Sequence, residues 1–128
     1  MILTALFFAC NSEFIGSFEG YTDGESYYVL LEADPAPIPF NEYFDVDISV
    51  FTDDSKSEQV DDLSVELNAN MPAHGHGMNE MPIMTGPSNG VFTAEGLKWF
   101  MEGEWELTAY IRGEKNENIS FLVECCSE

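Results

Sequence analysis

Apolar and polar residues alternate one by one along four stretches of this chain, at residues 44–50, 63–67, 105–111 and 119–123. A period of two sends successive side chains to opposite faces, so each stretch predicts a β-strand with one apolar face and one mostly polar face. Residues 27–31 are apolar on both faces and predict a central strand, and residues 14–18 and 91–94 predict shorter strands. No stretch has a convincing helical period.

Turn-forming residues separate these seven expected strands, including Asp23-Gly24 and a proline-rich stretch at residues 34–39. Short strands at this spacing predict an all-β fold, an immunoglobulin-like antiparallel β-sandwich of about seven strands. A length of 128 residues suits one such domain. We expect a signal-like segment at residues 1–10, a tether and first strand at residues 11–25, and the sandwich domain at residues 26–128.

The first ten residues, MILTALFFAC, contain an apolar run that is too short to span a bilayer but has the length of a signal-peptide hydrophobic region. Its end, Ala9-Cys10, resembles a bacterial lipobox, although no Lys or Arg precedes the run. We therefore expect an exported protein of the bacterial periplasm or cell envelope, a lipoprotein with its lipid on Cys10. The alternative is a buried first strand with an ordinary cysteine.

The chain is strongly acidic, with 24 Asp and Glu residues against 4 Lys and Arg and a net charge of -20. Binding to nucleic acid requires clustered basic residues, and an anionic membrane surface would repel this charge. We therefore expect no nucleic acid partner, and a membrane contact only through the lipid on Cys10. The acidic surface is most simply a solvated one, and it also suits a cationic ligand.

Residues 71–84, MPAHGHGMNEMPIM, contain both histidines of the protein and four of its six methionines. Pro72 and Pro82 exclude a paired central strand, so the segment is expected to be a surface loop. Imidazole nitrogen and thioether sulfur together favour Cu(I) and also suit Cu(II), whereas zinc more often takes cysteine, histidine and carboxylate. The segment therefore predicts a copper site.

The expected nitrogen ligands are His74 and His76, and Met71 and Met78 bracket them as the expected sulfur ligands. Glycines between these residues allow the loop to close around an ion. Two other interpretations stay open: methionines of such a loop can pack on the end of the core, and the histidines can cap loop carbonyls.

Four segments of the sequence, PAPIPFNEYFDVDISVF, VELNANMPAHGHGM, GVFTAEGLKWFMEGEWELTAYI and ISFLVE, resemble the YtkA-like and FixH-like envelope domains. The shared pattern is a Met-Pro-x-His-Gly-His loop followed by a Phe-Met-x-Gly-x-Trp stretch. The resemblance implies an immunoglobulin-like sandwich that is exported or membrane-tethered and is connected with copper handling and oxidase assembly. This chain lacks the full N-terminal transmembrane helix of FixH-like proteins, which favours a lipoprotein or a soluble envelope form.

The resemblance adds Met101 as a further candidate sulfur ligand; the alternative is a core methionine beside Phe100 and Trp105. The vicinal Cys125 and Cys126 are expected to be a strand end and a tail, since neighbouring cysteines rarely bridge each other. They could also bind metal or pair between molecules.

The sequence has no Ser/His/Asp or Cys/His arrangement and no phosphate-binding glycine loop, so we expect no enzyme activity. The predicted function is an exported copper-binding protein that captures or delivers copper, with an envelope copper donor or acceptor protein as its partner. The alternative is a structural or interaction module of the cell envelope that binds no metal.

Overall fold

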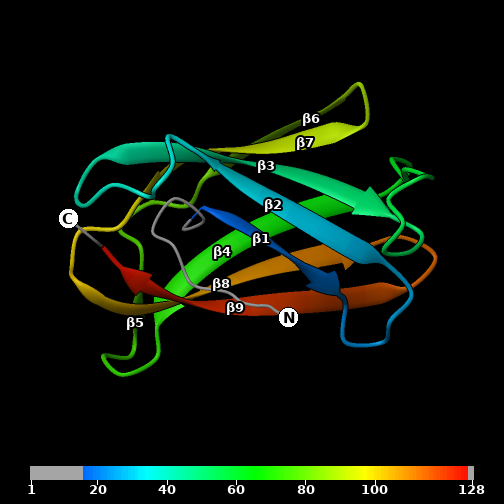
Figure 1. The fold of residues 1–128 in the computed structure, drawn as a ribbon. Helices are drawn as coiled ribbons and strands as arrows, with labels where there is room; N and C mark the ends of the chain where they lie inside the picture. The colour runs from blue at the N-terminus through cyan, green and yellow to red at the C-terminus, as the bar shows by residue number, and fades with distance from the viewer. Residues whose placement is uncertain (1–15, 127–128) are drawn as a thin grey trace, which may run out of the picture.

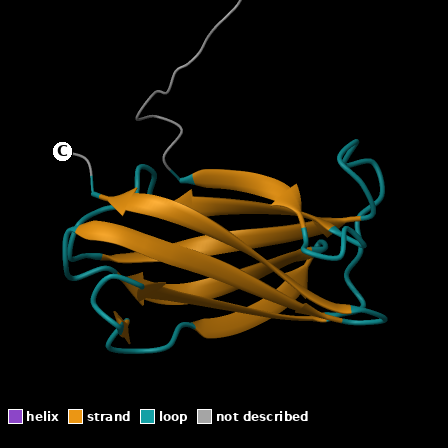
Figure 2. Cartoon of the chain, turned by 90° about the horizontal axis from the view of Figure 1, so that it is seen from below, coloured by secondary structure: helices purple, strands orange, loops and turns teal. Residues whose placement is uncertain are grey.

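The computed structural model describes residues 16–126, which form two antiparallel sheets packed face to face (Figure 1). The first sheet contains, in spatial order, β1 (Ser17–Tyr21), β2 (Tyr28–Asp34), β3 (Tyr43–Phe51), β7 (Val91–Lys98) and β6 (Ile83–Ser88). The second contains β5 (His76–Gly77), β4 (Ser64–Met71), β8 (Gly103–Arg112) and β9 (Asn116–Cys125). The described residues are strands and loops, as Figure 2 shows, which confirms the predicted β-sandwich.

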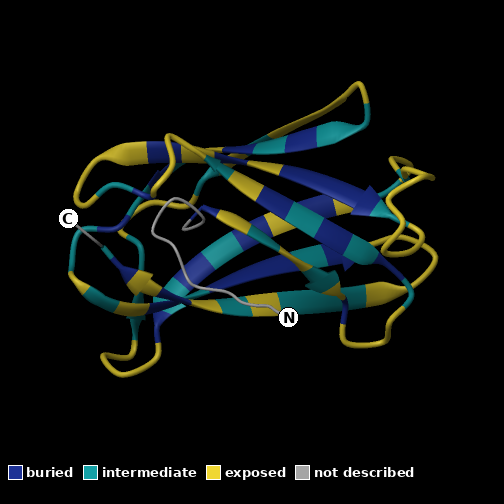
Figure 3. Cartoon of the chain, in the orientation of Figure 1, coloured by how far each residue is buried: buried dark blue, intermediate teal, exposed yellow. Residues whose placement is uncertain are grey.

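The core lies between the two sheets, and Figure 3 shows buried residues alternating with exposed or half-buried ones along strands such as β2 and β4. The alternation that predicted the strands gives the correct faces: Val46 and Ile48 of β3 and Trp105 and Leu107 of β8 are at most 1% exposed. Trp99 is also fully buried, in the connection from β7 to β8. Leu63 and Phe121, on the apolar faces of the strands predicted at residues 63–67 and 119–123, are half-buried against this core.

Two strands were not expected from the sequence. β5 has only two residues, and β6 is an edge strand whose Ile83 is 66% exposed, so neither has the alternation of a half-buried strand. Near the start of the described residues, β1 extends to Tyr21 and pairs with β2, so this strand belongs to the sandwich. Residues 1–15, with the expected signal-like segment and Cys10, lie outside the described residues. Among the residues that are described, no helix is long and apolar enough to cross a membrane.

The outer face of the first sheet carries acidic residues on neighbouring strands. Glu32 of β2 is paired directly with Asp47 of β3, and Asp34 is paired with Asp45. All four side chains are exposed. Thr93 Oγ1 donates a hydrogen bond of 2.9 Å to the carboxylate of Asp47.

A carboxylate fastens the turn between β1 and β2 to β9, on the right in Figure 1. Glu117 of β9 accepts hydrogen bonds from Thr22 Oγ1 at 2.6 Å, from the Ser26 backbone nitrogen at 3.0 Å and from Ser26 Oγ at 2.5 Å. The bonds from Ser26 and Thr22 hold the pKa of Glu117 below its usual 4.5, because they stabilise the charged form. We call this group of hydrogen bonds the Glu117 latch.

Candidate metal-binding site

Met71 is the last residue of β4 and is buried, 1% exposed, so the expectation that residues 71–84 form an exposed loop throughout is wrong. The inward positions of β4 continue past Val65 and Leu67 to Met71, and the strand ends only where Pro72 cannot donate to the ladder. The turn that follows is closed by the backbone nitrogens of His74 and Gly75, which donate to the Met71 carbonyl at 3.1 and 2.9 Å.

This turn returns the chain to β4, where His76 of β5 pairs directly with Met71. Directly opposed residues of an antiparallel pair have side chains on the same face, with Cβ atoms about 4.5–5.5 Å apart. The imidazole of His76 and the thioether of Met71 are therefore neighbours. Two of the residues that the sequence proposed as ligands thus meet at the edge of the second sheet.

The imidazole of His76 lies close to three other rings. The His74 ring is stacked with it at a centroid distance of 5.7 Å, and the Phe100 ring is stacked with it at 5.6 Å. The Trp105 ring is steeply inclined to the same imidazole, with centroids 6.3 Å apart. These contacts fix the plane of a half-buried ring, whereas His74 itself is exposed.

The hydrogen bonding of His76 leaves one ring nitrogen for a ligand. Its Nδ1 lies 3.1 Å from the carbonyl oxygen of Gly77. A carbonyl can only accept, so Nδ1 carries the proton of the neutral ring and Nε2 has the lone pair. Metal-ligating histidines commonly have one nitrogen fixed in this way.

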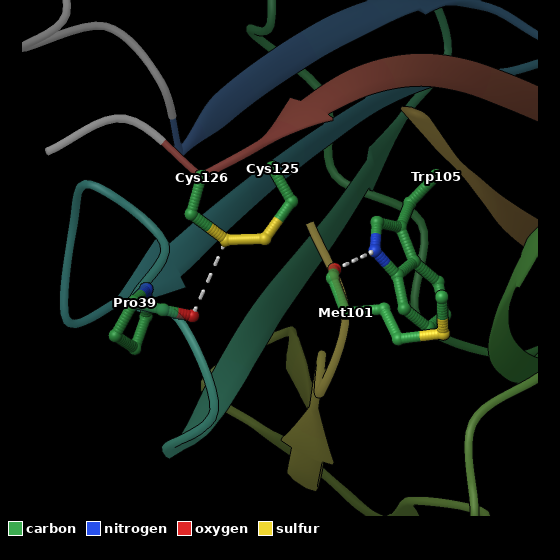
Figure 4. The surroundings of a disulfide bond; sticks show 5 residues. All are labelled: Pro39, Met101, Trp105, Cys125 and Cys126. Carbon is green, nitrogen blue, oxygen red and sulfur yellow. Dashed lines mark hydrogen bonds between the residues drawn. A yellow bond between two sulfur atoms is a disulfide. The ribbon is translucent and has the colours of Figure 1, made fainter. Parts of the chain in front are cut away.

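The other methionines of interest are placed by different contacts. Trp105 Nε1 donates to the Met101 carbonyl at 3.0 Å (Figure 4), and the Met101 side chain is half-buried against the core. Met78, two residues beyond His76, is also half-buried against the core. The structure therefore brings His74, His76 and Met71 together directly, while Met78 and Met101 lie at the same end through other neighbours. Met81 is 64% exposed.

A shallow groove adjoins the Phe100 side of this cluster, with a volume of about 240 Å³. Its lining is mostly polar: Asn41, Tyr43, Asn79, Glu80, Gly96, Lys98 and Phe100. Tyr43 Oη donates to Glu80 at 3.3 Å, and Lys98 Nζ lies 5.0 Å from the centre of the Tyr43 ring. The groove gives solvent access to the Phe100 ring that stacks on His76.

The vicinal cysteines depart from the expectation. Cys125 is the last residue of β9, as expected of a strand end, but a disulfide joins it to Cys126 (Figure 4). Among residues 16–126, no group of three or more His, Cys, Asp or Glu side chains is arranged to hold a metal ion.

Sequence spacing did not show that Phe100 stacks on His76, because the two residues are far apart in the chain. A signal was present, since Phe100 and Trp105 both belong to the Phe-Met-x-Gly-x-Trp stretch. In the sequence, Trp105 begins the alternating stretch at residues 105–111. The structure places it fully buried, with its ring steeply inclined to that of His76.

A family model described as YtkA-like matches residues 32–109, from β2 into β8, and includes the whole cluster around His76. The chain belongs to the YtkA-like family. The resemblance seen in the sequence is thereby confirmed for this family. No curated protein matches the chain in sequence.

Two solved structures of FetP from uropathogenic Escherichia coli strain F11 share the fold. A copper-bound glutamate-to-glutamine variant is 9% identical, with a TM-score of 0.57, and the match covers 85% of this chain and 94% of that chain. FetP as isolated after expression in the E. coli periplasm is 10% identical, with a TM-score of 0.56, covering 85% and 93%. At this identity the similarity establishes the β-sandwich alone.

Proposed function

We propose that this YtkA-like protein binds copper as cargo through the cluster around His76 and captures or delivers the ion in the cell envelope. The observation that carries the proposal is His76 itself, whose Nδ1 is directed at Gly77 and whose ring is stacked with the rings of His74 and Phe100. An imidazole held in this way presents Nε2 without further ordering, which lowers the entropic cost of coordination.

The donor set fits copper better than zinc. His74 and His76 are the proposed nitrogen ligands, and Met71, which is paired with His76 across β4 and β5, is the first proposed sulfur ligand, with Met78 and Met101 as further sulfur ligands at the same end. Thioethers are soft and suit Cu(I), and imidazoles with water suit Cu(II). The oxidation state preferred by the site is therefore Cu(I) as long as sulfur takes part.

The copper-bound FetP structure and the expression of FetP in the periplasm support a copper-related envelope role for a protein of the same fold. We propose export of this chain, with a lipid on Cys10, and exchange of copper with a donor or acceptor protein. We also propose binding rather than catalysis, because two imidazoles without a third fixed nitrogen or oxygen ligand do not make an open catalytic centre.

The test is a competition titration of Cu(I) against a chromogenic chelator, for the wild type and for the double variant His74→Ala/His76→Ala. The variant should lose most of the affinity, and the wild type should hold Cu(I) more tightly than Zn(II). Ser55→Ala/Ser57→Ala is a matched control, because it changes two residues of an exposed turn between β3 and β4. Equal affinities for the wild type and the histidine variant would end the proposal and favour an envelope module without metal.

A further inference from the structure

The vicinal cysteines lie at the same end of the sandwich as His76, and the proposed function makes no use of them. Cys125 is 4% exposed, and its direct partner on β8 is Gly103. Cys126 is half-buried at the rim, where its sulfur lies 3.6 Å from the Pro39 carbonyl oxygen (Figure 4). One sulfur of the pair is thus directed into the core, and the other is at its edge.

Gly103 leaves a space beside Cys125, and Met71 enters it. A Cβ atom at Gly103 would lie only 2.7 Å from the terminal methyl carbon of Met71. Direct cross-strand partners have Cβ positions about 4.5–5.5 Å apart, so the end of the Met71 thioether is close to the Cys125 side chain. Met71 therefore reaches from the β4–β5 pair, where it opposes His76, to the cysteine pair at the end of β9.

From this placement we propose that reduced Cys125 and Cys126, with Met71, form a second site for a soft metal ion such as Cu(I). In the disulfide state the two sulfurs are joined and are poor ligands. Two electrons and two protons convert the disulfide into two thiols, and each thiol gives up its proton on binding the metal. Two thiolates and one thioether then provide three soft sulfur ligands.

With this second site, the end of the sandwich that contains Met71, Cys125 and Cys126 has two states, one with the disulfide and one with two thiols. With the disulfide formed, Met71 is available as a ligand only to the cluster around His76. With the disulfide reduced, Met71 lies between two groups of ligands, and a copper ion can pass from imidazole to thiolate coordination. A dithiol of a partner protein is the class of reductant that would set this state, by thiol–disulfide exchange.

The test uses the full chain with Cys10→Ser and His74→Ala/His76→Ala, so that the only thiols are Cys125 and Cys126 and the proposed histidine site is absent. A phosphine reduces the disulfide and becomes a phosphine oxide, and it is removed by anaerobic gel filtration. The thiol count should then rise by two per chain. Cu(I) affinity, measured against a chromogenic chelator, should increase at least about tenfold over the oxidised protein, and X-ray absorption should count three sulfur neighbours.

Met71→Leu in the same background keeps the side-chain volume and removes the sulfur. It should weaken Cu(I) binding by the reduced protein about tenfold and reduce the count to two sulfurs. Met84→Leu is the matched control, because Met84 packs against the same core from β6 and should change neither. The proposal is overturned by equal affinities before and after reduction, by a thiol count that does not rise, or by two sulfurs with Met71 intact. Failure here leaves the histidine site standing, since that site is absent from the tested protein.

Discussion

At one end of the sandwich the carboxylate of Glu117 accepts three hydrogen bonds from the β1–β2 turn, and at the other the imidazole of His76 is stacked with the rings of His74 and Phe100. The donors and acceptors of the latch are used within the protein. At the His76 end, the methionine side chains have packing contacts with the core, and the buried Trp99 indole nitrogen has no hydrogen-bond partner among the described residues. The hydrogen bonds of the first end hold the fold together, whereas the side chains proposed as ligands at the second end are held mainly by packing.

The largest effect should come from His76→Ala, which removes the fixed imidazole. Loss of outer contacts to a ligand typically costs 10–100-fold in metal affinity, so loss of the ligand itself should cost about 100-fold or more for Cu(I). His74→Ala should reduce Cu(I) affinity less, because His74 is exposed and its ring is stacked with one other ring, that of His76. Chelator competition gives both affinities. A larger loss for His74 would show that the ring stack does not organise the site.

Phe100→Leu should lower Cu(I) affinity by about tenfold, the lower end of the range for residues that position a ligand. Leucine keeps an apolar side chain against the core but removes the ring that stacks on His76 at 5.6 Å. Phe18→Leu is the control, since the Phe18 ring packs at a tilt against Phe121, away from the cluster, and the change should leave affinity unchanged. If both variants bind like the wild type, Phe100 has no part in the site.

Trp105→Phe should destabilise the fold more than Trp99→Phe, by about 1 kcal/mol, the net value of a typical hydrogen bond. Both indoles are fully buried and stack on each other with centroids 5.1 Å apart, so the two changes remove similar packing. Only Trp105 donates its indole N–H, to the Met101 carbonyl. Urea denaturation measures the difference, and equal losses would mean that this bond does not contribute to stability.

The smallest effect should come from Glu117→Gln, which weakens the latch without touching the cluster around His76. Because folding lowers the pKa of Glu117, its charge stabilises the folded state above pH 4.5, and this contribution is lost as pH falls through the folded pKa. The variant should melt slightly lower than the wild type at pH 7, and the difference should shrink in acid. Thermal melts from pH 7 to pH 3 test this, with Cu(I) affinity unchanged at pH 7. A difference that grows in acid would contradict the assignment.

Most of the fold follows from short-range pattern, as β3 and β8 illustrate: alternation alone placed Val46, Ile48, Trp105 and Leu107 inside. The sequence pattern did not predict β5, because two residues cannot show a period. This strand depends on its pairing with β4, including Met71, across a turn. Met71 was assigned to a loop because Pro72 follows it, yet proline ends a strand only at its own position, and the residue before it can still complete the ladder.

The candidate site was predictable in composition and not in geometry. The residue types between Met71 and Met78 pointed to copper without any coordinates. The stacking of Phe100 on His76 could not be predicted, because it joins β5 to the connection between β7 and β8, and the approach of these two segments is set by the packing of both sheets. The nearness of Cys125 to Met71 has the same origin, since it depends on the register of β8 with β9 and on the missing side chain of Gly103.

The paired acidic residues on the outer face of the first sheet make this fold sensitive to ionic strength. Glu32 opposes Asp47 and Asp34 opposes Asp45, and like charges in direct cross-strand pairs repel. Their separation of about 4.5–5.5 Å between Cβ atoms exceeds the Debye length of about 3 Å in 1 M salt, so dissolved ions screen the repulsion. In a chain of net charge -20, sodium chloride should therefore raise the midpoint of urea denaturation, and the folded protein should be least stable at low ionic strength.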